Sequence, residues 1–286
     1  MTHISKYLSD WKTKHPGSVP GWVKDCGRAY LRATSKWRAL PDFIVLGTPK
    51  SGTTSFYAYL SQHKSIIPSL EKEPSYLRDN RFVSFQAYQA CFPMRSTLRA
   101  TDSLTGEGTT TYYYDGKVAV RINELPKLPK LFLVVRDPVD RAISQFYHFQ
   151  RNQREAGDID EVFNYLLSRY QSWSIGDALP TWDSDRTASD YLKYGIYAFF
   201  YPLWQEYHEK GQLKIFEFNE LISRPSDVME DAFKFLNLES AAIEWDVFNK
   251  GTKREKHSEL KEKLASFYHP FNQRFVEQTS LGGDWR

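Results

Sequence analysis

The chain has 286 residues, close to the upper limit for one hydrophobic core, so one domain with an N-terminal extension is the expected organisation. Its net charge of +3 is too small to favour nucleic acid as a partner, and its two cysteines, Cys26 and Cys91, offer no disulfide framework. No stretch is apolar for long enough to span a membrane, and the first residues lack the apolar core of a signal peptide. These properties favour a protein of the reducing cytoplasm without a membrane span.

Residues 1–40 are basic and aromatic, and we expect them to form an extension with a helix packed on the catalytic domain, residues 41–286. Binding of this extension to an anionic surface is the alternative. After it, apolar runs of strand type alternate with amphipathic helical patterns. Strands are predicted at 43–46, about 131–135 and 213–218, and helices at 53–62, 138–151, 195–209 and 226–236. This order predicts an α/β fold with a P-loop-like central parallel β-sheet flanked by helices, interrupted by a polar segment at 152–190.

Residues 43–55 join an apolar strand to a helix through a turn of small residues that carries one lysine and several hydroxyls. Free N–H groups at a helix start, beside a lysine, hold phosphate-like groups. Gly47 and Gly52 have the spacing of the ordinary ATP-binding loop, but Thr53 follows the second glycine and the lysine stands at position 50. The segment therefore predicts a variant of the P-loop, although a simple tight turn is the alternative. The candidate anion-binding residues are Lys50, Ser51, Gly52, Thr53, Thr54 and Ser55.

A second apolar strand, 131–135, ends in a charged turn that opens a helix. Asp137 can cap this helix, while Arg136 and Ser144 can bind an anion through a guanidinium fork and a hydroxyl. Taken alone, the segment is better explained as a surface ion-pair cluster of Arg136, Asp137 and Arg141. Two anion sites at strand ends favour a ligand with two anionic ends, because α/β sheets bind ligands at that edge.

These two motifs resemble those of the sulfotransferase superfamily, which uses 3′-phosphoadenylyl sulfate (PAPS) as sulfuryl donor. Residues 49–55 are similar to its 5′-phosphosulfate loop, and Arg136 with Ser144 is similar to its 3′-phosphate site. The C-terminal region resembles the carbohydrate branch of heparan-type and bacterial members. The resemblance implies the sulfotransferase fold, PAPS as donor, PAP as product and no metal. It also implies a loop that closes on the 3′-phosphate and adenine, formed by Lys250, Gly251, Thr252, Lys253 and Arg254.

Sulfuryl transfer needs a base for the proton of the acceptor and a cation for the leaving phosphate, as phosphoryl transfer does. Lys50 is the candidate for the cation. The resemblance implies that Glu73 is the base, because a similar segment of the carbohydrate branch holds a catalytic glutamate. Without the resemblance, Glu73 would be interpreted as a solvated loop residue. His63 and His148 are the alternatives, since cytosolic relatives use a histidine base.

The segment 106–115 departs from part of the family, because heparan-type members place a lysine where Gly108 stands. Glu107 could then bind the acceptor or even act as the base. The adjacent tyrosines could stack on an acceptor ring, although tyrosine clusters more often pack in a core. The candidate acceptor-binding residues are Glu107, Tyr112, Tyr113 and Trp173.

The sequence therefore predicts a PAPS-dependent sulfotransferase that modifies a hydroxyl, or an amine, of a carbohydrate or small natural product. A P-loop nucleotide kinase or NTPase is the alternative enzyme class. The displaced lysine and the lack of a convincing Mg²⁺-binding aspartate at a strand end weaken it. A non-catalytic nucleotide-binding protein is a third hypothesis, against which the presence of Glu73 and Lys50 argues.

Overall fold

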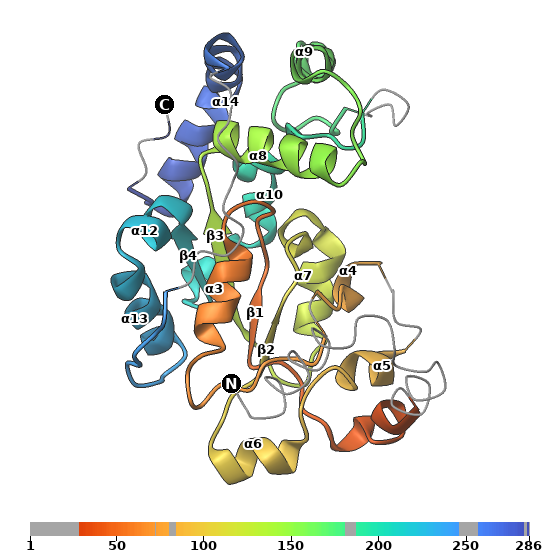
Figure 1. The fold of residues 1–286 in the computed structure, drawn as a ribbon, viewed down its shortest axis with the longest axis vertical. Helices are drawn as coiled ribbons and strands as arrows, with labels where there is room; N and C mark the ends of the chain where they lie inside the picture. Colours follow the sequence, from red (N-terminus) through yellow and green to blue (C-terminus); the bar gives the residue numbers. More distant parts are fainter. Residues whose placement is uncertain are drawn as a thin grey trace.

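The computed structural model describes residues 29–71, 73–79, 84–180, 187–245, 257–282 and 285. At its centre lies a parallel sheet in which the described residues form four strands in the order β2-β1-β3-β4 (Figure 1). The strands are β1 (Phe43–Val45), β2 (Gly106–Gly108), β3 (Lys130–Val135) and β4 (Leu213–Glu217). The predicted α/β architecture and the three predicted strands are confirmed. Because all four strands are parallel, their carboxyl ends meet at one edge of the sheet.

One face of the sheet is covered by α3 (Thr53–Leu60) and α13 (Pro225–Phe235), both of which were predicted (Figure 1). The contact is largely aromatic. The ring of Phe132 on β3 lies edge-on to Phe56 of α3, with 5.3 Å between the ring centroids. This face holds the start of α3, and with it the loop after β1, against the sheet.

The other face is covered by α7 (Gly116–Asn123), α10 (Tyr197–Phe200) and α11 (Gln205–Glu209). A single helix was predicted at 195–209, and that prediction is wrong. The structure divides the segment into the 3₁₀ turns η3 (Lys193–Gly195) and η4 (Tyr201–Leu203) with the two short α-helices beside them. Pro202 lies in η4, and it prevents a continuous helix because it has no N–H to donate and clashes with the preceding turn.

A further core lies among α8 (Pro138–Arg151), α9 (Ile159–Tyr170) and α14 (Ser258–Thr279), beyond the carboxyl end of β3 (Figure 1). α8 has the predicted bounds. The segment 152–190 was interpreted only as polar, yet it contains α9. This helix has buried apolar residues with helical spacing, and the Asp158 carboxylate caps it by accepting from the N–H groups of its first turn.

The structure also describes several shorter helices. They are η1 (Ser35–Trp37), α4 (Tyr76–Asp79), α5 (Phe85–Gln89), α6 (Arg95–Thr101), η2 (Tyr112–Tyr114) and α12 (Phe218–Ser223). Buried Arg38 ties the segment after η1 to the residues after α5, because its Nη1 donates to the carbonyl oxygen of Phe92 at 2.8 Å. Residues 1–28 lie outside the described residues, so the predicted role of the extension stays a prediction. Within the described ranges, no helix combines the length and the apolarity needed to cross a membrane.

Candidate active site

The turn between β1 and α3 requires glycine at two positions. Gly47 has a φ of +151°, and a Cβ there would lie 2.6 Å from the carbonyl oxygen of Thr110. Gly52 has a φ of +77°, and a Cβ there would lie 2.8 Å from the ring of Phe218. Both positions combine an unfavourable φ for other residues with close packing. The turn is therefore held in one shape by its neighbours in the segment 108–111 and in α12.

Two buried hydroxyls fix the interior of this turn. Thr48 Oγ1 donates to the carbonyl oxygen of Val134 on β3 at 3.1 Å and lies 2.5 Å from Ser51 Oγ. Since the single hydroxyl hydrogen of Thr48 goes to Val134, Ser51 is the donor in the second bond. The side chain of Ser51, predicted to bind the donor, is fully buried inside the turn. Its hydroxyl thus stabilises the loop.

The helix α3 begins with features suited to an anion. Gly52 is its N-cap, and in the described part of the chain no side chain caps it through a hydrogen bond. The first N–H groups of a helix point along its axis and carry the positive end of the helix dipole. Half-buried Lys50 lies just before this start, and Thr54 and Ser55 of the first turn are also half-buried. The site predicted from residues 50–55 is therefore present as a helix start with a lysine beside it.

Arg136 joins the second predicted anion site to the first. It follows β3 directly, and its Nη1 donates to the carbonyl oxygen of Lys50 at 3.2 Å. Its guanidinium also lies 4.6 Å from the centroid of the Phe218 ring and 3.9 Å from a carboxylate oxygen of Asp140. The side chain is 15% exposed, so part of it faces outward. The two motifs, 86 residues apart in sequence, thus form one continuous surface at the sheet edge.

Phe218 is a site residue that the sequence interpretation missed. Its ring packs against Gly52 on one contact and against Arg136 on another. Phe218 follows β4 directly, as Arg136 follows β3. The predicted strand, 213–218, included Phe218 as its last residue, so the available signal was an aromatic side chain at the carboxyl end of a predicted parallel strand.

Helix α8 begins at the second predicted anion site and turns Arg141 inward. Asp137 caps the helix, as predicted, by accepting from the N–H of Asp140 at 2.9 Å. Arg141 is fully buried, and it donates to Gln145 Oε1 at 2.6 Å and to the carbonyl oxygen of Tyr191. The alternative of a surface ion-pair cluster is therefore wrong for Arg141.

Ser144 and His148 occupy successive turns of α8. Ser144 is 5% exposed and His148 is half-buried. Burial lowers the pKa of His148, and the positive charge of Lys50 lowers it further, with contributions from Arg151 and Arg154. The imidazole is therefore near enough to the turn after β1 to respond to the charge of Lys50.

Glu73 is connected to the same loop through Thr110. The half-buried Glu73 has a φ of +53°, and its Oε1 accepts a hydrogen bond from Thr110 Oγ1 at 3.5 Å. The carbonyl oxygen of Thr110 is the atom that would meet a Cβ at Gly47. Thr110 thus lies between the carboxylate and the turn after β1. The structure thus brings Glu73 close to the turn after β1, with Thr110 between them.

Glu107 lies on β2 and is fully buried. Its carboxylate accepts hydrogen bonds from the hydroxyls of Tyr88 (2.7 Å), Thr109 (2.8 Å) and Tyr112 (3.2 Å). Burial raises the pKa of Glu107 to about 7, although these three hydrogen bonds lower it in part. The prediction that Glu107 binds the acceptor is not supported, because its carboxylate is covered by these side chains.

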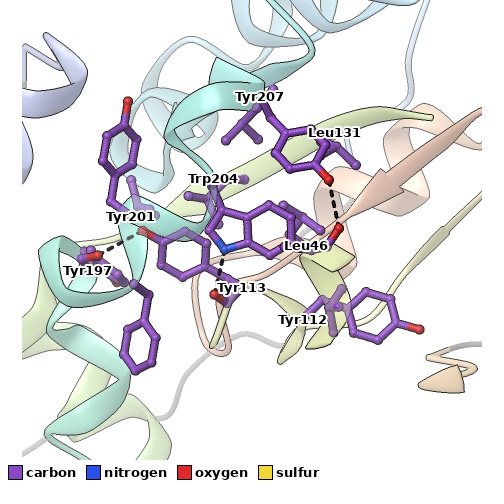
Figure 2. Packing of buried hydrophobic residues seen from close by; sticks show 14 of the residues in the cluster. Leu46, Tyr112, Tyr113, Leu131, Tyr197, Tyr201, Trp204 and Tyr207 are labelled. Carbon is purple, nitrogen blue, oxygen red and sulfur yellow. Dashed lines mark hydrogen bonds between the residues drawn. The ribbon is translucent and has the colours of Figure 1, made fainter. Parts of the chain in front are cut away.

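Tyr112 and Tyr113 are core residues. Both are fully buried, so neither has a ring face open to a ligand. In Figure 2, Tyr113 packs with Trp204, whose Nε1 donates to the carbonyl oxygen of Tyr113 at 2.8 Å, while the Tyr112 ring extends away from this pair. The Tyr113 hydroxyl donates to the carbonyl oxygen of Tyr197 at 2.9 Å. The prediction that they stack on an acceptor is wrong, and the packing alternative is correct.

Trp173 is half-buried at the cluster of α9 and α14. Its ring contacts Tyr170 and Phe271 with centroid separations of 5.5 Å and 5.6 Å. Its Nε1 donates to the carbonyl oxygen of Ala178 at 3.1 Å. Trp173 is therefore fixed by packing, and its predicted contact with an acceptor stays a prediction.

His63 is a structural residue. It is 3% exposed at the far end of α3, and its Nδ1 accepts from the N–H of Ser65 at 3.0 Å. The hydrogen is then on Nε2, which donates to the carbonyl oxygen of Glu239 at 3.0 Å. Because both ring nitrogens are engaged and buried, the alternative of His63 as base is wrong.

Two further predictions concern the donor and metal ions. The loop Lys250–Arg254 lies outside the described residues, so its role as a lid stays a prediction. Where the structure describes side chains, no three or more His, Cys, Asp and Glu residues are grouped so as to hold a metal ion.

Comparison with known proteins identifies relatives and a solved structure that are all named as sulfotransferases. Human bifunctional heparan sulfate N-deacetylase/N-sulfotransferase 3 is 30% identical over 205 residues, which cover 70% of this chain and 22% of the relative. Mouse heparan sulfate glucosamine 3-O-sulfotransferase 5 is 24% identical over 270 residues, covering 86% of this chain and 74% of the relative. A solved sulfotransferase from Alicyclobacillus acidocaldarius, 24% identical, shares the fold with a TM-score of 0.65, over 87% of this chain and 99% of that one.

The chain thus spans less than a quarter of the length of the bifunctional relatives. The family model of the sulfotransferase domain matches residues 40–285, which is most of the chain. That range includes the turn after β1, Arg136 and the segment with Glu73. The chain belongs to the sulfotransferase domain family, as the resemblance of its two strand-end motifs predicted.

Proposed function

We propose that this chain transfers the sulfuryl group of PAPS to a hydroxyl or an amine of a carbohydrate or small natural product. The observation that carries the proposal is the hydrogen bond from Arg136 to the carbonyl oxygen of Lys50. This bond joins Lys50, just before the start of α3, to Arg136, which follows the neighbouring strand β3. Two anion-binding groups close together at one sheet edge suit a donor with an anion at each end.

The donor set fits PAPS in chemical type. The start of α3, with Lys50 and the hydroxyls of Thr53 to Ser55, suits the phosphosulfate, because N–H groups, ammonium and hydroxyls all donate to oxyanions. Arg136 and Ser144 suit the 3′-phosphate in the same way. PAPS, when bound, supplies the sulfuryl group and a leaving phosphate. The resemblance implies that residues 250–254 bind the adenine end of the donor, and the proposal includes that role.

Lys50 and Glu73 have complementary roles in this proposal. Lys50 stabilises the negative charge that develops on the leaving phosphate oxygen as the S–O bond to the donor breaks. Glu73 accepts the proton of the acceptor as the new S–O or S–N bond forms. The link from Glu73 through Thr110 to Gly47 supports this assignment. His148 is the second candidate base, because burial and Lys50 lower its pKa and favour the neutral imidazole.

The acceptor class follows from the relatives, which are named for heparan sulfate, with one N-sulfotransferase and one 3-O-sulfotransferase. We extend this to a carbohydrate acceptor as a proposal only. The cytoplasmic location predicted from the sequence likewise stays a prediction.

Binding and transfer assays together test the proposal. We expect PAP to bind more tightly than ADP or ATP, with and without Mg²⁺, by calorimetry. Radiolabelled PAPS is then offered with an N-unsubstituted heparosan oligosaccharide, an N-acetylated one and a simple phenol. Label on an oligosaccharide supports the carbohydrate acceptor, and comparison of the first two distinguishes the amine from the hydroxyls. Label on the phenol alone, or Mg²⁺-dependent preference for ATP, contradicts the proposal.

A further inference from the structure

The buried carboxylate of Glu107 fixes the direction of the hydrogen bonds around it. An ionised carboxylate has no hydrogen and only accepts. Each hydroxyl that faces it must therefore point its hydrogen at Glu107. The oxygen lone pairs of Thr109 and Tyr112 are then left to accept from other groups.

Those lone pairs hold the main chain of the segment that carries Glu73. The N–H of Ser75 donates to Thr109 Oγ1 at 3.3 Å, and the N–H of Leu77 donates to the Tyr112 hydroxyl at 3.2 Å. Two paths of two hydrogen bonds each thus lead from the Glu107 carboxylate to the main chain after Glu73. One passes through the Thr109 hydroxyl to Ser75, and the other through the Tyr112 hydroxyl to Leu77.

The third partner of Glu107 reaches the same segment through its ring. Tyr88 donates to Glu107, and its ring is stacked on Tyr76 with 4.7 Å between centroids and 14° between planes. Among the described residues, each of the three whose hydroxyl donates to Glu107 therefore also contacts the segment 75–77, two through the hydroxyl and Tyr88 through its ring. The cluster is directed at this one segment, although its members come from α5, from β2 and the residue after it, and from η2.

The segment needs such support because of its backbone. Glu73 and Ser75 have φ values of +53° and +58°, in the left-handed region that side chains other than glycine rarely adopt. Such conformations persist where the surroundings determine them, and they occur often at functional sites. Loss of the two main-chain hydrogen bonds would release residues 73–77 toward ordinary backbone conformations. The Glu73 carboxylate would then leave its place beside Thr110.

We infer that Glu107 is a positioning residue that fixes the Glu73 carboxylate through the hydroxyls of Thr109 and Tyr112. The inference rests on the proposed function, in which Glu73 is the base. It excludes a direct role for Glu107, whose carboxylate has no exposed surface.

The test is a double-mutant cycle between residues 73 and 107. Glu107→Gln keeps the shape but brings an N–H₂ group against hydroxyls that already donate. We expect the turnover number for transfer from PAPS to the heparosan oligosaccharide to fall by roughly 10²-fold, the usual cost of a small misplacement. PAP affinity should stay unchanged. In a Glu73→Gln background the same change at 107 should cost little more, because the group that it positions is already absent.

Hydrogen exchange gives a readout that does not depend on the acceptor. In the PAP complex, Glu107→Gln should reduce the protection of the amides of Ser75 and Leu77. Thr109→Val and Tyr112→Phe should each reduce protection at their own partner, and they replace Glu107→Gln if that variant fails to fold. Tyr207→Phe is the matched control, since it also removes one buried hydroxyl, which donates to the carbonyl oxygen of Ala119 at 2.8 Å. It should change neither protection nor transfer.

The outcomes separate the two proposals. If Glu73→Gln alone leaves transfer intact, the assigned base is wrong and the positioning role falls with it. A different result is that Glu73→Gln abolishes most transfer while Glu107→Gln lowers it by the same factor in the wild-type and in the Glu73→Gln background. In that case Glu73 remains the assigned base and the positioning role of Glu107 is overturned. Unchanged protection of residues 75 and 77 in Glu107→Gln also overturns it.

Discussion

The proposed donor side of the site, around Lys50 and Arg136, and the proposed acceptor side, around Glu73, are held in place by different means. On the donor side, the structure is fixed mainly through the main chain. Two glycines shape the turn, and Arg136 donates to the carbonyl oxygen of Lys50. On the acceptor side, Glu73 lies on a left-handed segment that buried hydroxyls hold from a distance. The first arrangement is built from two contiguous motifs. The second is assembled from residues of three different elements.

The difference has a functional meaning. A turn fixed by its own glycines and by one arginine needs little further adjustment to bind the proposed donor, so we expect the donor site to be preformed. A base on a segment held through hydroxyls can be displaced without loss of the donor site. We therefore expect changes on the acceptor side to lower transfer alone, and changes on the donor side to lower binding of PAP as well.

The largest expected effect breaks the acceptor side. Glu73→Gln keeps the shape of the side chain but removes the basic carboxylate, so transfer should fall by roughly 10²–10⁴-fold, the usual contribution of a general base. PAP affinity, measured by calorimetry, should not change. Glu71→Gln, an exposed residue of the same loop, is the matched control. Normal transfer in Glu73→Gln together with a large loss in His148→Ala would reassign the base to the histidine.

A smaller loss is expected at Lys50, where the donor side takes part in chemistry. Lys50→Ala should lower the turnover number by roughly 10²–10³-fold, because the ammonium acts mainly on charge that develops in the transition state. PAP affinity should fall much less. Steady-state kinetics at saturating PAPS separates the two. A variant with weak PAP binding and normal turnover at saturation would make Lys50 a binding residue only.

Arg136 sharpens the comparison within the donor side. Arg136→Ala should weaken PAP by about 1.5–3 kcal/mol, the contribution of a charged hydrogen bond. AMP serves as the control ligand, because it lacks the 3′-phosphate but would be affected equally by any disturbance of Lys50. The ratio of the two affinities isolates the phosphate contact. Equal losses for PAP and AMP would remove Arg136 from that role.

A prediction of another kind concerns stability, and not binding or transfer, on the proposed acceptor side. Burial raises the pKa of Glu107 from 4.5 to about 7, so between these values the folded protein holds more protons than the unfolded one. The stability contributed by protonated Glu107 is complete below the unfolded pKa and is lost as the pH rises through the folded pKa. Urea unfolding from about pH 4.5 to about pH 8 should show wild type losing stability relative to Glu107→Gln.

The tyrosines and the cysteine around Glu107 do not titrate in the window between about pH 4.5 and about pH 8. Tyr57, Tyr88 and Tyr112 all have raised pKa values, and Cys91 has a pKa of about 12, so none of them titrates there. The charge of nearby Glu73 adds to the shift of Glu107. A flat difference between wild type and variant over the window would contradict the prediction.

Glu155 provides the matched control for this titration. It is also buried, at 7% exposure, and burial raises its pKa, but hydrogen bonds from Ala188, Gly157, Tyr191 and Thr187 more than offset this. Its pKa is therefore lowered, and the stability that it contributes is lost only as the pH falls through that value. Glu155→Gln should leave the difference constant over the same window. For Glu107, in contrast, the ionised state that orders residues 75–77 is the less stable one.

The donor side could be predicted from sequence because its signals are local. An apolar run, a glycine turn and a hydroxyl-rich helix start are adjacent along the chain, and α8 carries its own cap and proline at its first turn. Physical chemistry of neighbouring residues is enough to define them. The contact between Arg136 and Lys50 required only that parallel strands end at one edge.

The acceptor side could not be predicted in the same way because its contacts are distant. β2 has the sequence Gly-Glu-Gly, which shows no strand pattern, and it is a strand only because it pairs with β1. The partner Tyr88 lies 19 residues before Glu107, and nothing along the chain relates the two. Glu107 was interpreted as a ligand residue because a carboxylate in a polar segment gives no sign of the core that will enclose it.

The position of Phe218 limits how this enzyme can be redesigned for another donor. One ring supports both Gly52 of the phosphosulfate loop and the guanidinium of Arg136. Replacing Arg136 to admit a donor without a 3′-phosphate would also remove a bond to Lys50 and one contact of this ring. Donor exchange would therefore need a new side chain that stacks on Phe218 and donates to the carbonyl oxygen of Lys50, while presenting no charge to the ligand.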